Sequence, residues 1–549
     1  MLVFGGLVVP QSSRSDLTLR SVTRLVQITV IAQDDRSQPV TDLKRDDFLL
    51  FDSGKPRDIK VFTMDRMDRQ QPSAAVETGV NPSARLFTNS ERERSGPTSV
   101  TVILIDSLNT KWTDQSRATR NFIHFLSQIR PHDHVAIYSI GLTGFRVLHD
   151  FTTDASDLVA QLASWKGEIP GANSSDLGDQ LASVLSGRDR GTTLNQRRAA
   201  GAETRMIGQT IPTLRVMEVL ANRLAAIPGR KNVIWISNGF PAATISAGKM
   251  ILVNSLDPRN TSDTVTDTMG DSANFAQQVD HAMHLLDSAH VSIYPIEARG
   301  LQVYLPNITG PPQPPPKVAT TPEVIADQAT QQAMQEIAWR TGGRAFILTN
   351  DIFGAIRTAM DDSRVTYTLG FYPESTRLDG KFHPITIKLA ERRGITLRYR
   401  KGYVDTPDAS GDPKQRKNDL EQAALSPVDA NAISLTARLE PSMTSGNFNL
   451  NLNINLSGFN LRPDGDTWIG EVDVFLLQRD QRGKEFGRVN DTITMRLKQT
   501  TYEQMLKTGA HYQHALTLSP KADMLRVVVR DARSGDLGSL TIPTAALIR

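Results

Sequence analysis

A carboxylate, two hydroxyls and an amide stand directly after one apolar run of the sequence. The run is Val102 to Ile105, and the polar residues are Asp106, Ser107, Asn109 and Thr110. A continuous apolar run is typical of a strand covered on both faces, whose carboxyl end delivers polar groups to a crevice. Oxygens gathered in such a crevice can dock a partner. This segment is therefore the candidate functional site.

The residue patterns of common catalytic motifs are absent from the sequence. It contains no Gly-x-Ser-x-Gly, His-Glu-x-x-His, Gly-x-x-x-x-Gly-Lys-Ser/Thr or Gly-x-Gly-x-x-Gly, so no nucleophile elbow, zinc-protease helix or phosphate-binding loop is assigned. The chain also has no cysteine, which excludes disulfides, thiolate zinc sites and cysteine nucleophiles together. We expect a protein that is not an enzyme.

Apolar runs alternate with stretches of helical periodicity on either side of the candidate site. The strand-like runs are 101–106, 134–140, 232–237 and 291–296. Strands that alternate with helices form a mostly parallel sheet, because each parallel connection must cross over the sheet. The sequence therefore predicts an α/β fold with a doubly wound, Rossmann-like sheet, whose first strand ends at Asp106.

The chain is too long for one core, and its composition changes at several points. At 549 residues, about three or four domains are expected. Short runs of alternating polarity with turn signals predict a small β module near the start and a β-sandwich at the end. The predicted division is a terminal segment 1–23, a β module 24–64, a linker 65–98, an α/β domain 99–372 with long loops 167–208, 242–271 and 298–321, an antiparallel β extension 373–404, a linker 405–430, and a β-sandwich 431–549.

The charge pattern does not favour a nucleic-acid partner. The 62 basic and 59 acidic residues leave a net charge of +3, so no strong field attracts polyanions or anionic membranes. One basic hairpin holds Arg398, Arg400 and Lys401, and charged edge strands of this kind commonly block edge-to-edge pairing. We expect another protein or an envelope macromolecule as the partner.

The first residues of the sequence give information on the cellular location of the protein. Met1–Pro10 is a short apolar run without a basic flank, which is read either as a frayed terminus or as the remnant of an export signal. No segment approaches the length of about 18 apolar residues that a membrane-spanning helix needs. We expect no transmembrane segment, and an extracytoplasmic location is the leading hypothesis.

Several segments in combination resemble a von Willebrand factor type A (VWA) domain, and the whole arrangement is similar to the acidobacterial VWFA-related family of bacterial proteins. The matching segments are 102–110, 130–137, 151–154, 228–241 and 379–403, so the resemblance covers roughly residues 24–404. It implies a VWA-like fold, an exported or envelope protein, and binding of another protein.

The resemblance also implies a metal-ion-dependent adhesion site. In the family, an Asp-x-Ser-x-Ser run, a Thr from a later loop and an Asp after a later strand surround Mg²⁺, and a partner carboxylate replaces a water among its six oxygens. Asp106 stands at the first position and Thr110 at the last, but Leu108 replaces the middle hydroxyl and Asn238 replaces the later Asp. Candidates for the loop threonine, between which spacing does not choose, are Thr204, Thr210 and Thr213.

Two interpretations of this degenerate site stay open. In the first, Mg²⁺ is held by Asp106, Thr110 and Asn238, and the protein binds a partner, for adhesion or assembly, in a crevice lined by Asp106, Ser107, Asn109, Thr110 and Asn238. In the second, Asp106 only caps or hydrogen-bonds within a vestigial crevice, and the chain is a structural or assembly module that makes its contacts through β surfaces and loops. A metal-dependent hydrolase is a remote third interpretation, for which no base or nucleophile is assigned.

Overall fold

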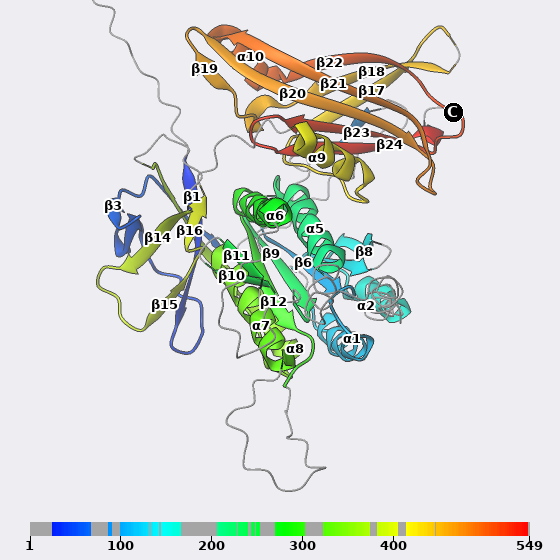
Figure 1. The fold of residues 1–549 in the computed structure, drawn as a ribbon. Coiled ribbons are helices and arrows are strands. Elements are labelled where there is room, and N and C mark those ends of the chain that lie inside the picture. Colours follow the sequence, from blue (N-terminus) through cyan, green and yellow to red (C-terminus); the bar gives the residue numbers. More distant parts are fainter. Residues whose placement is uncertain are drawn as a thin grey trace, which may run out of the picture.

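The fold is that of a computed structural model, which describes residues 25–66, 86–89, 99–130, 133–141, 144–165, 206–227, 229–239, 243–246, 249–252, 269–301, 322–373, 382–404, 413–444 and 446–546. Figure 1 shows an α/β part at the centre, an N-terminal β part beside it and a C-terminal β part above it. Met1–Pro10, Thr204 and most of the three predicted long loops lie outside the described residues.

Strand β6 (Ser99–Asp106) lies in the middle of the central sheet, whose order is β12-β9-β6-β7-β8. It is parallel to β7 (Val135–Gly141) on one side and to β9 (Arg230–Ser237) on the other, and β12 (Val291–Glu297) is parallel to β9. The outer strand β8 (Gly144–Thr152) is antiparallel to β7. The predicted α/β part with parallel strands is thus confirmed as a mixed sheet, whose antiparallel edge was not predicted.

Helices cover both faces of this sheet, because successive residues of its inner strands point to opposite faces and are apolar on both. Ile103 and Ile105 pack into one layer, whereas Val102 and Leu104 pack into the other. The first layer is completed by α1 (Trp112–Leu126), α2 (Ala155–Ser164) and α8 (Ile352–Asp361). The second is completed by α5 (Ile211–Leu224), α6 (Met269–Ser288) and α7 (Pro322–Thr341). Every residue of β6 is therefore buried.

The predicted loop 242–271 was wrong in part. It contains a hairpin of β10 (Ala243–Ser246) and β11 (Lys249–Leu252), and α6 begins at Met269 within it. The pairing joins Ile245 to Met250, a short apolar match within a segment whose many Thr and Asp residues favoured an irregular structure.

The N-terminal β part is assembled from two distant pieces of the chain. Its first sheet has the order β15 (Ile395–Arg398), β1 (Val26–Asp34), β13 (Val365–Phe371) and β4 (Val61–Arg66), and its second has the order β16 (Gly402–Val404), β14 (Phe382–Leu389), β2 (Phe48–Asp52) and β3 (Lys55–Arg57). The β module 24–64 and the extension 373–404 therefore share one core. Strand β13, which the sequence placed in the α/β domain, belongs to this core because it pairs antiparallel with β1 and β4.

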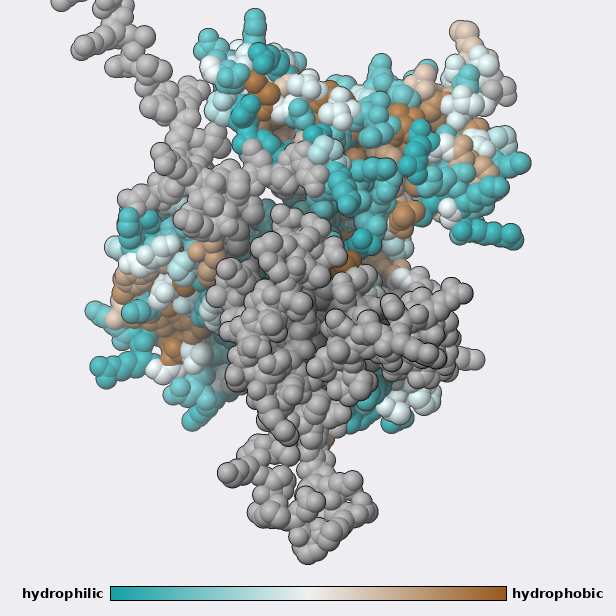
Figure 2. Space-filling view, in the orientation of Figure 1, coloured by the Kyte–Doolittle hydropathy of each residue, from teal (hydrophilic) through white to brown (hydrophobic). Residues whose placement is uncertain are grey.

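The C-terminal β part also has two facing sheets, as the sandwich prediction requires. One has the order β22 (Ala510–Thr517), β18 (Asn447–Ile454), β17 (Leu435–Pro441) and β5 (Leu86–Thr88), and the other joins β19 (Arg462–Asp464), β20 (Thr467–Arg479), β23 (Met524–Asp531) and β24 (Leu537–Pro543), with β21 (Glu485–Lys498) paired to β20. Helix α10 (Gln499–Thr508) follows β21. In the view of Figure 2, hydrophilic residues cover most of this part, with apolar residues scattered among them.

Two segments that the sequence marked as linkers contribute to the C-terminal part. Strand β5, from the predicted linker 65–98, pairs with β17. Helix α9 (Pro413–Leu425), from the predicted linker 405–430, packs Leu420 and Ala424 against Phe475 and Val528 of the sheet. These segments are polar overall, so their few apolar residues gave no strand or helix signal. Within the described residues, no helix is long and apolar enough to cross a membrane.

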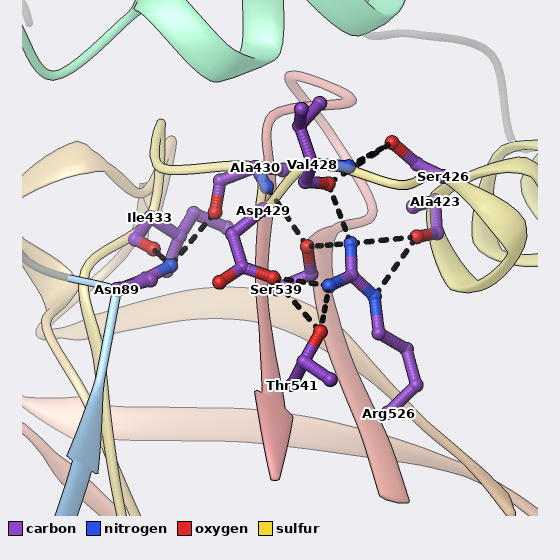
Figure 3. Close-up of polar contacts among 10 residues, drawn as sticks. All are labelled: Asn89, Ala423, Ser426, Val428, Asp429, Ala430, Ile433, Arg526, Ser539 and Thr541. Carbon is purple, nitrogen blue, oxygen red and sulfur yellow. Dashed lines mark hydrogen bonds and ion pairs between the residues drawn. The ribbon is translucent and has the colours of Figure 1, made fainter. Parts of the chain in front are cut away.

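Residues 428–433, which we call the junction segment, connect α9 to the sandwich and hydrogen-bond to the α/β part. Figure 3 shows their contacts with Arg526 and Asn89. Arg526 of β23 is almost fully buried, and it donates to the carbonyl oxygens of Val428 at 2.7 Å and Ala423 at 3.1 Å while pairing with Asp429. Asn431 joins the junction segment to α5, because its backbone N–H donates to the carbonyl oxygen of Asn222 at 3.0 Å.

Asn89, at the end of β5, fastens the same segment from the other side. Its amide nitrogen donates to the carbonyl oxygens of Ala430 at 2.7 Å and Ile433 at 2.9 Å, and its amide oxygen accepts from the backbone N–H of Leu435 at 2.6 Å. One buried side chain therefore satisfies three backbone groups, and the chain on either side of the α/β part is held together there.

We expect Asn89→Ala to lower the free energy of unfolding by about 2 kcal/mol or more, because it leaves buried backbone groups without partners. Urea denaturation followed by circular dichroism measures this change. Asn449→Ala, the same substitution at an exposed position of β18, is the matched control and should change stability by less than about 0.5 kcal/mol. Equal effects of the two substitutions would contradict the role given to Asn89.

Candidate functional site

The Asp106 carboxylate, at the end of β6, is fully buried and accepts four hydrogen bonds. Its Oδ1 accepts from the backbone N–H of Asn109 at 2.9 Å. Its Oδ2 accepts from Asn109 Nδ2 at 2.7 Å, Trp235 Nε1 at 3.0 Å and Ser237 Oγ at 2.9 Å. The carboxylate thus ties the loop after β6 to the neighbouring strand β9.

Burial raises the pKa of Asp106, and the hydrogen bonds from Asn109, Ser237 and Trp235 oppose that rise. Desolvation penalises the charged form of a carboxyl group, whereas donors aimed at it favour the charged form. Among the described residues, every group that hydrogen-bonds to the Asp106 carboxylate is neutral. A further positive charge at this point would therefore be stabilising.

Helix α5 reaches the site through Thr213. Asn109 Nδ2 donates to Thr213 Oγ1 at 2.8 Å, and Gln209 Nε2 donates to the Leu108 carbonyl at 3.3 Å. Residues Met206–Thr210, just before α5, form a turn of π-helix, a rare geometry that is frequent at functional sites. Of the three candidate threonines, Thr213 contacts the site, Thr210 is buried at the start of the same helix, and Thr204 lies outside the described residues.

Asn238 is not among the residues that hydrogen-bond to Asp106; its side chain bonds to α1 instead. Its Nδ2 donates to Asp114 Oδ2 at 3.0 Å, and this bond fixes which way the amide points. The next residue, Gly239, has φ of +84° and a backbone N–H that donates to Ser237 Oγ at 2.9 Å. A Cβ there would come within 2.4 Å of Thr330 Cγ2, so glycine is required for the turn that places Asn238.

Five side-chain oxygens of the loop after β6, the start of α5 and the turn after β9 are buried and have no hydrogen-bond partner among the described residues. They are Ser107 Oγ, Asn109 Oδ1, Thr110 Oγ1, Thr210 Oγ1 and Asn238 Oδ1. Buried polar atoms are nearly always satisfied by protein, water or an ion. All five come from the loop after β6, the start of α5 and the turn after β9, and the contacts of Asp106, Asn109 and Ser237 bring these three segments together.

The oxygen atoms at this site are of the kind that binds hard cations, but they include only one negatively charged group, the Asp106 carboxylate. Hydroxyl and amide oxygens are ligands for Mg²⁺ and Ca²⁺. Each carboxylate oxygen has two lone pairs, and Asp106 Oδ1 accepts one hydrogen bond from the described residues, which leaves one lone pair for an ion or a water. Nowhere in the described ranges do three or more His, Cys, Asp or Glu side chains form a group that could hold a metal. The arrangement therefore offers oxygen atoms of a suitable type but only one carboxylate.

Sequence reasoning missed the residues that hold Asp106 in place. Trp235 and Ser237 lie within the apolar strand β9 and were read only as part of its core, and Gln115 on α1 was not singled out. Gln115 Nε2 donates to the carbonyl oxygens of Thr110 at 2.7 Å and Ser107 at 3.2 Å, which shapes the loop. A Trp and a Ser two residues apart on one strand do point to the same face, and that spacing was the available signal.

The basic hairpin is engaged in contacts within the chain. Arg398 forms an ion pair with Asp362, and Arg400 pairs with Asp287 of α6 at 3.4 Å. The Lys401 ammonium lies 3.7 Å from the centre of the Tyr399 ring. The two ion pairs connect the N-terminal β part to the α/β part, whereas the contact between Lys401 and Tyr399 lies within the N-terminal β part.

Asp106→Ala should lower the free energy of unfolding by roughly 3 kcal/mol or more, because Trp235 Nε1, Ser237 Oγ and the Asn109 N–H lose their buried acceptor. Denaturant melts and the emission maximum of tryptophan report the loss. The control is Ser107→Ala, which removes a hydroxyl without a described partner and should cost less than about 1 kcal/mol. If the two variants were equally stable, Asp106 would not be the acceptor that holds the loop.

Comparisons with known proteins give low similarities. Neither a family model nor a curated protein sequence matches the chain. Among solved structures, proximal thread matrix protein 1 from the mussel byssus is 11% identical with a TM-score of 0.23, over 48% of this chain and 47% of that one. The VWA domain of SpRpn10 is 14% identical with a TM-score of 0.12, over 26% of this chain and 76% of that domain. The human COPII-coat protein Sec24c is 8% identical with a TM-score of 0.21, over 57% of this chain and 44% of that one. The similar structures thus include a VWA domain, and at these TM-scores they carry no conclusion about function.

Proposed function

We propose that the protein is a non-catalytic binding protein, for adhesion or assembly, whose VWA-like α/β part holds a weak cation site at the carboxyl end of β6. The observation that carries the proposal is the set of five buried oxygens without described partners, in segments that the hydrogen bonds of Asp106 and Asn109 bring together. An extracytoplasmic location, from the family resemblance, belongs to the same proposal.

The residues that would hold Mg²⁺ are Thr110 and Asn238 through their unpaired oxygens, with Asp106 and Ser107 beside them. Because the Asn238 amide nitrogen is engaged by Asp114, its oxygen is the atom left for a ligand. The cation would supply a positive centre that a carboxylate of the partner can complete. The Asp106 charge would be balanced at the same time.

Large apolar side chains are exposed along the same edge of the sheet. Trp112, which begins α1 shortly after Thr110, is 48% exposed, Leu301 after β12 is 58% exposed, and Leu348 is 47% exposed. The Leu348 N–H donates to Glu297 at the end of β12 at 2.9 Å, which places it at this edge. Exposed apolar side chains beside a polar crevice are typical of a protein-binding surface.

A structural or assembly module with an inert crevice is the second candidate, and one specific observation favours it. Asp106 is 0% exposed and already accepts four hydrogen bonds, so a partner cannot reach it directly. In that case, water molecules hydrogen-bond to the buried hydroxyl and amide oxygens of the crevice, and the N-terminal and C-terminal β parts make the contacts with partner molecules.

Titration with Mg²⁺ or Mn²⁺ separates the two candidates. Binding to the folded state should raise the free energy of unfolding by about 2.7 kcal/mol at a hundred times the dissociation constant, as seen in thermal melts and calorimetry. Thr110→Val should abolish the effect, because it removes one ligand oxygen while keeping the shape. Thr494→Val, at an exposed position of β21, should leave it intact. No effect of either ion on the wild type would favour the inert crevice.

Partner binding is tested on the same variants. Immobilised wild-type protein should retain an envelope protein in Mg²⁺ and release it in EDTA, and Thr110→Val and Trp112→Ser should both retain less. Trp112→Ser changes only an exposed side chain of the proposed surface, so its loss of capture would not reflect unfolding. Capture that is insensitive to EDTA and to both substitutions would contradict binding at this edge.

A further inference from the structure

A cavity of about 60 Å³ lies between the α/β part and the C-terminal part, away from Asp106. Its walls come from α5, α6, α9, the junction segment and the β23–β24 turn. The polar side chains that line it on the α/β side are Arg215, Glu218, Asn222, Gln278 and His281, and those on α9 are Gln415, Asn418, Asp419 and Gln422. The cavity therefore has both polar and apolar walls, and it is formed where the two parts meet.

One wall of the cavity is held rigidly by the contacts drawn in Figure 3. Ala423, Val428 and Ser539 line the cavity, and all three are bonded to Arg526, at 3.1 Å, 2.7 Å and 2.9 Å. Ser539 Oγ also accepts from the Ala430 N–H at 2.8 Å. A wall whose backbone groups are satisfied in this way keeps the cavity open, because its collapse would break buried hydrogen bonds.

Glu218 lines the cavity and is half-buried, and its carboxylate has no hydrogen-bond or ion-pair partner among the described residues. Burial, together with the nearby charge of Asp419, raises the pKa of Glu218 to about 8, and Arg215 opposes the rise. A half-buried carboxylate without a hydrogen-bond donor is less stable in its charged form than one in water. This side chain is therefore the unbalanced group of the cavity.

The other titratable groups around Glu218 are already balanced. Asp419 of α9 forms an ion pair with Arg530 of β23 at 2.8 Å and accepts from Gln415 Nε2 at 2.7 Å. Burial lowers the pKa of His281 on α6, which keeps that ring neutral at neutral pH. From α5 itself, Arg215 also lines the cavity; its side chain is exposed to solvent and forms no ion pair with Glu218 among the described residues. The cavity thus presents one acid without a hydrogen-bond partner, in a wall that also holds side-chain amides, a neutral ring and one solvated guanidinium.

The size of the cavity limits what it can take. A water needs about 10 to 15 Å³ measured in this way, and drug-sized ligands occupy pockets of roughly 300 Å³ or more. A space of about 60 Å³ therefore suits a head group of a few atoms. A primary ammonium group fits both this size and the chemistry of the cavity, because it can donate three hydrogen bonds and its positive charge can pair with the Glu218 carboxylate.

We propose that the cavity between α5, α6 and α9 binds a small organic cation with a primary ammonium group, through Glu218, and that this ligand strengthens the contact between the two parts. The proposal does not depend on the cation site beside Asp106. Since Glu218 is mostly protonated at pH 7, the ligand binds the ionised form and one proton leaves to the buffer.

Calorimetry with methylammonium chloride tests the proposal on the full chain. At pH 7 the wild type should bind methylammonium, and the measured heat should vary with the ionisation enthalpy of the buffer, which reports up to one released proton. Glu218→Gln, of the same size and without charge, should lose binding at least tenfold. Glu503→Gln, at an exposed position of α10, should bind as the wild type does.

Three results would overturn the proposal: no binding to the folded wild type, equal binding by Glu218→Gln, or equal binding of tetramethylammonium, which has the charge but no N–H donor and is too large. Circular dichroism confirms that each variant is folded before titration. Because Glu218 has no partner to lose, the Gln variant is expected to fold.

The pH dependence of stability gives a separate readout. A carboxyl group whose pKa is about 8 when folded and near 4.5 when unfolded binds more protons in the folded state between these values, so stability falls as pH rises from about 4.5 to 8. The urea midpoint of Glu218→Gln should fall less over this range than that of the wild type. If the urea midpoints of the two proteins changed equally with pH, the pKa of Glu218 would not be raised by burial and by the charge of Asp419.

Discussion

The α/β part depends on one buried charge at the end of its central strand. Asp106 can be buried because Trp235, Ser237 and Asn109 donate to it, and these bonds fix the loop after β6 against β9. The same hydrogen bonds occupy most of the lone pairs of the Asp106 carboxylate, so the residues around Asp106 also determine what the site can bind. Asp106 was predicted from the sequence to be a metal ligand, and in the structure it is the hydrogen-bond acceptor that shapes the crevice.

The sequence predicted well wherever a local pattern decides the structure. Continuous apolar runs gave the inner strands of the mixed sheet, and helical spacing such as Ala118, Phe122 and Phe125 gave the helices that cover it. Pairing between distant segments has no such signal. Strand β13 looks like the last strand of the α/β domain, yet it pairs with β1, and β5 looks like part of a linker, yet it extends the C-terminal sheet.

The sequence offered candidate residues for the site but not their contacts. The family resemblance named Asp106, Thr110 and Asn238, and it marked Leu108 and Asn238 as departures from the family pattern. It did not choose among the threonines, because that choice depends on how α5 packs, and Thr213 meets Asn109 only in the folded chain. The cavity beside Glu218 was invisible for the same reason, since its walls come from three helices and a β turn that meet at a junction between parts.

The central claim is that the oxygens beside Asp106 hold a cation. Crystals grown with Mn²⁺ and measured at the manganese absorption edge test it most directly. The account predicts an anomalous peak within coordination distance of Thr110 Oγ1 and Asn238 Oδ1, next to Asp106. A map that shows only ordered waters at these oxygens, at a saturating concentration of Mn²⁺, would contradict it.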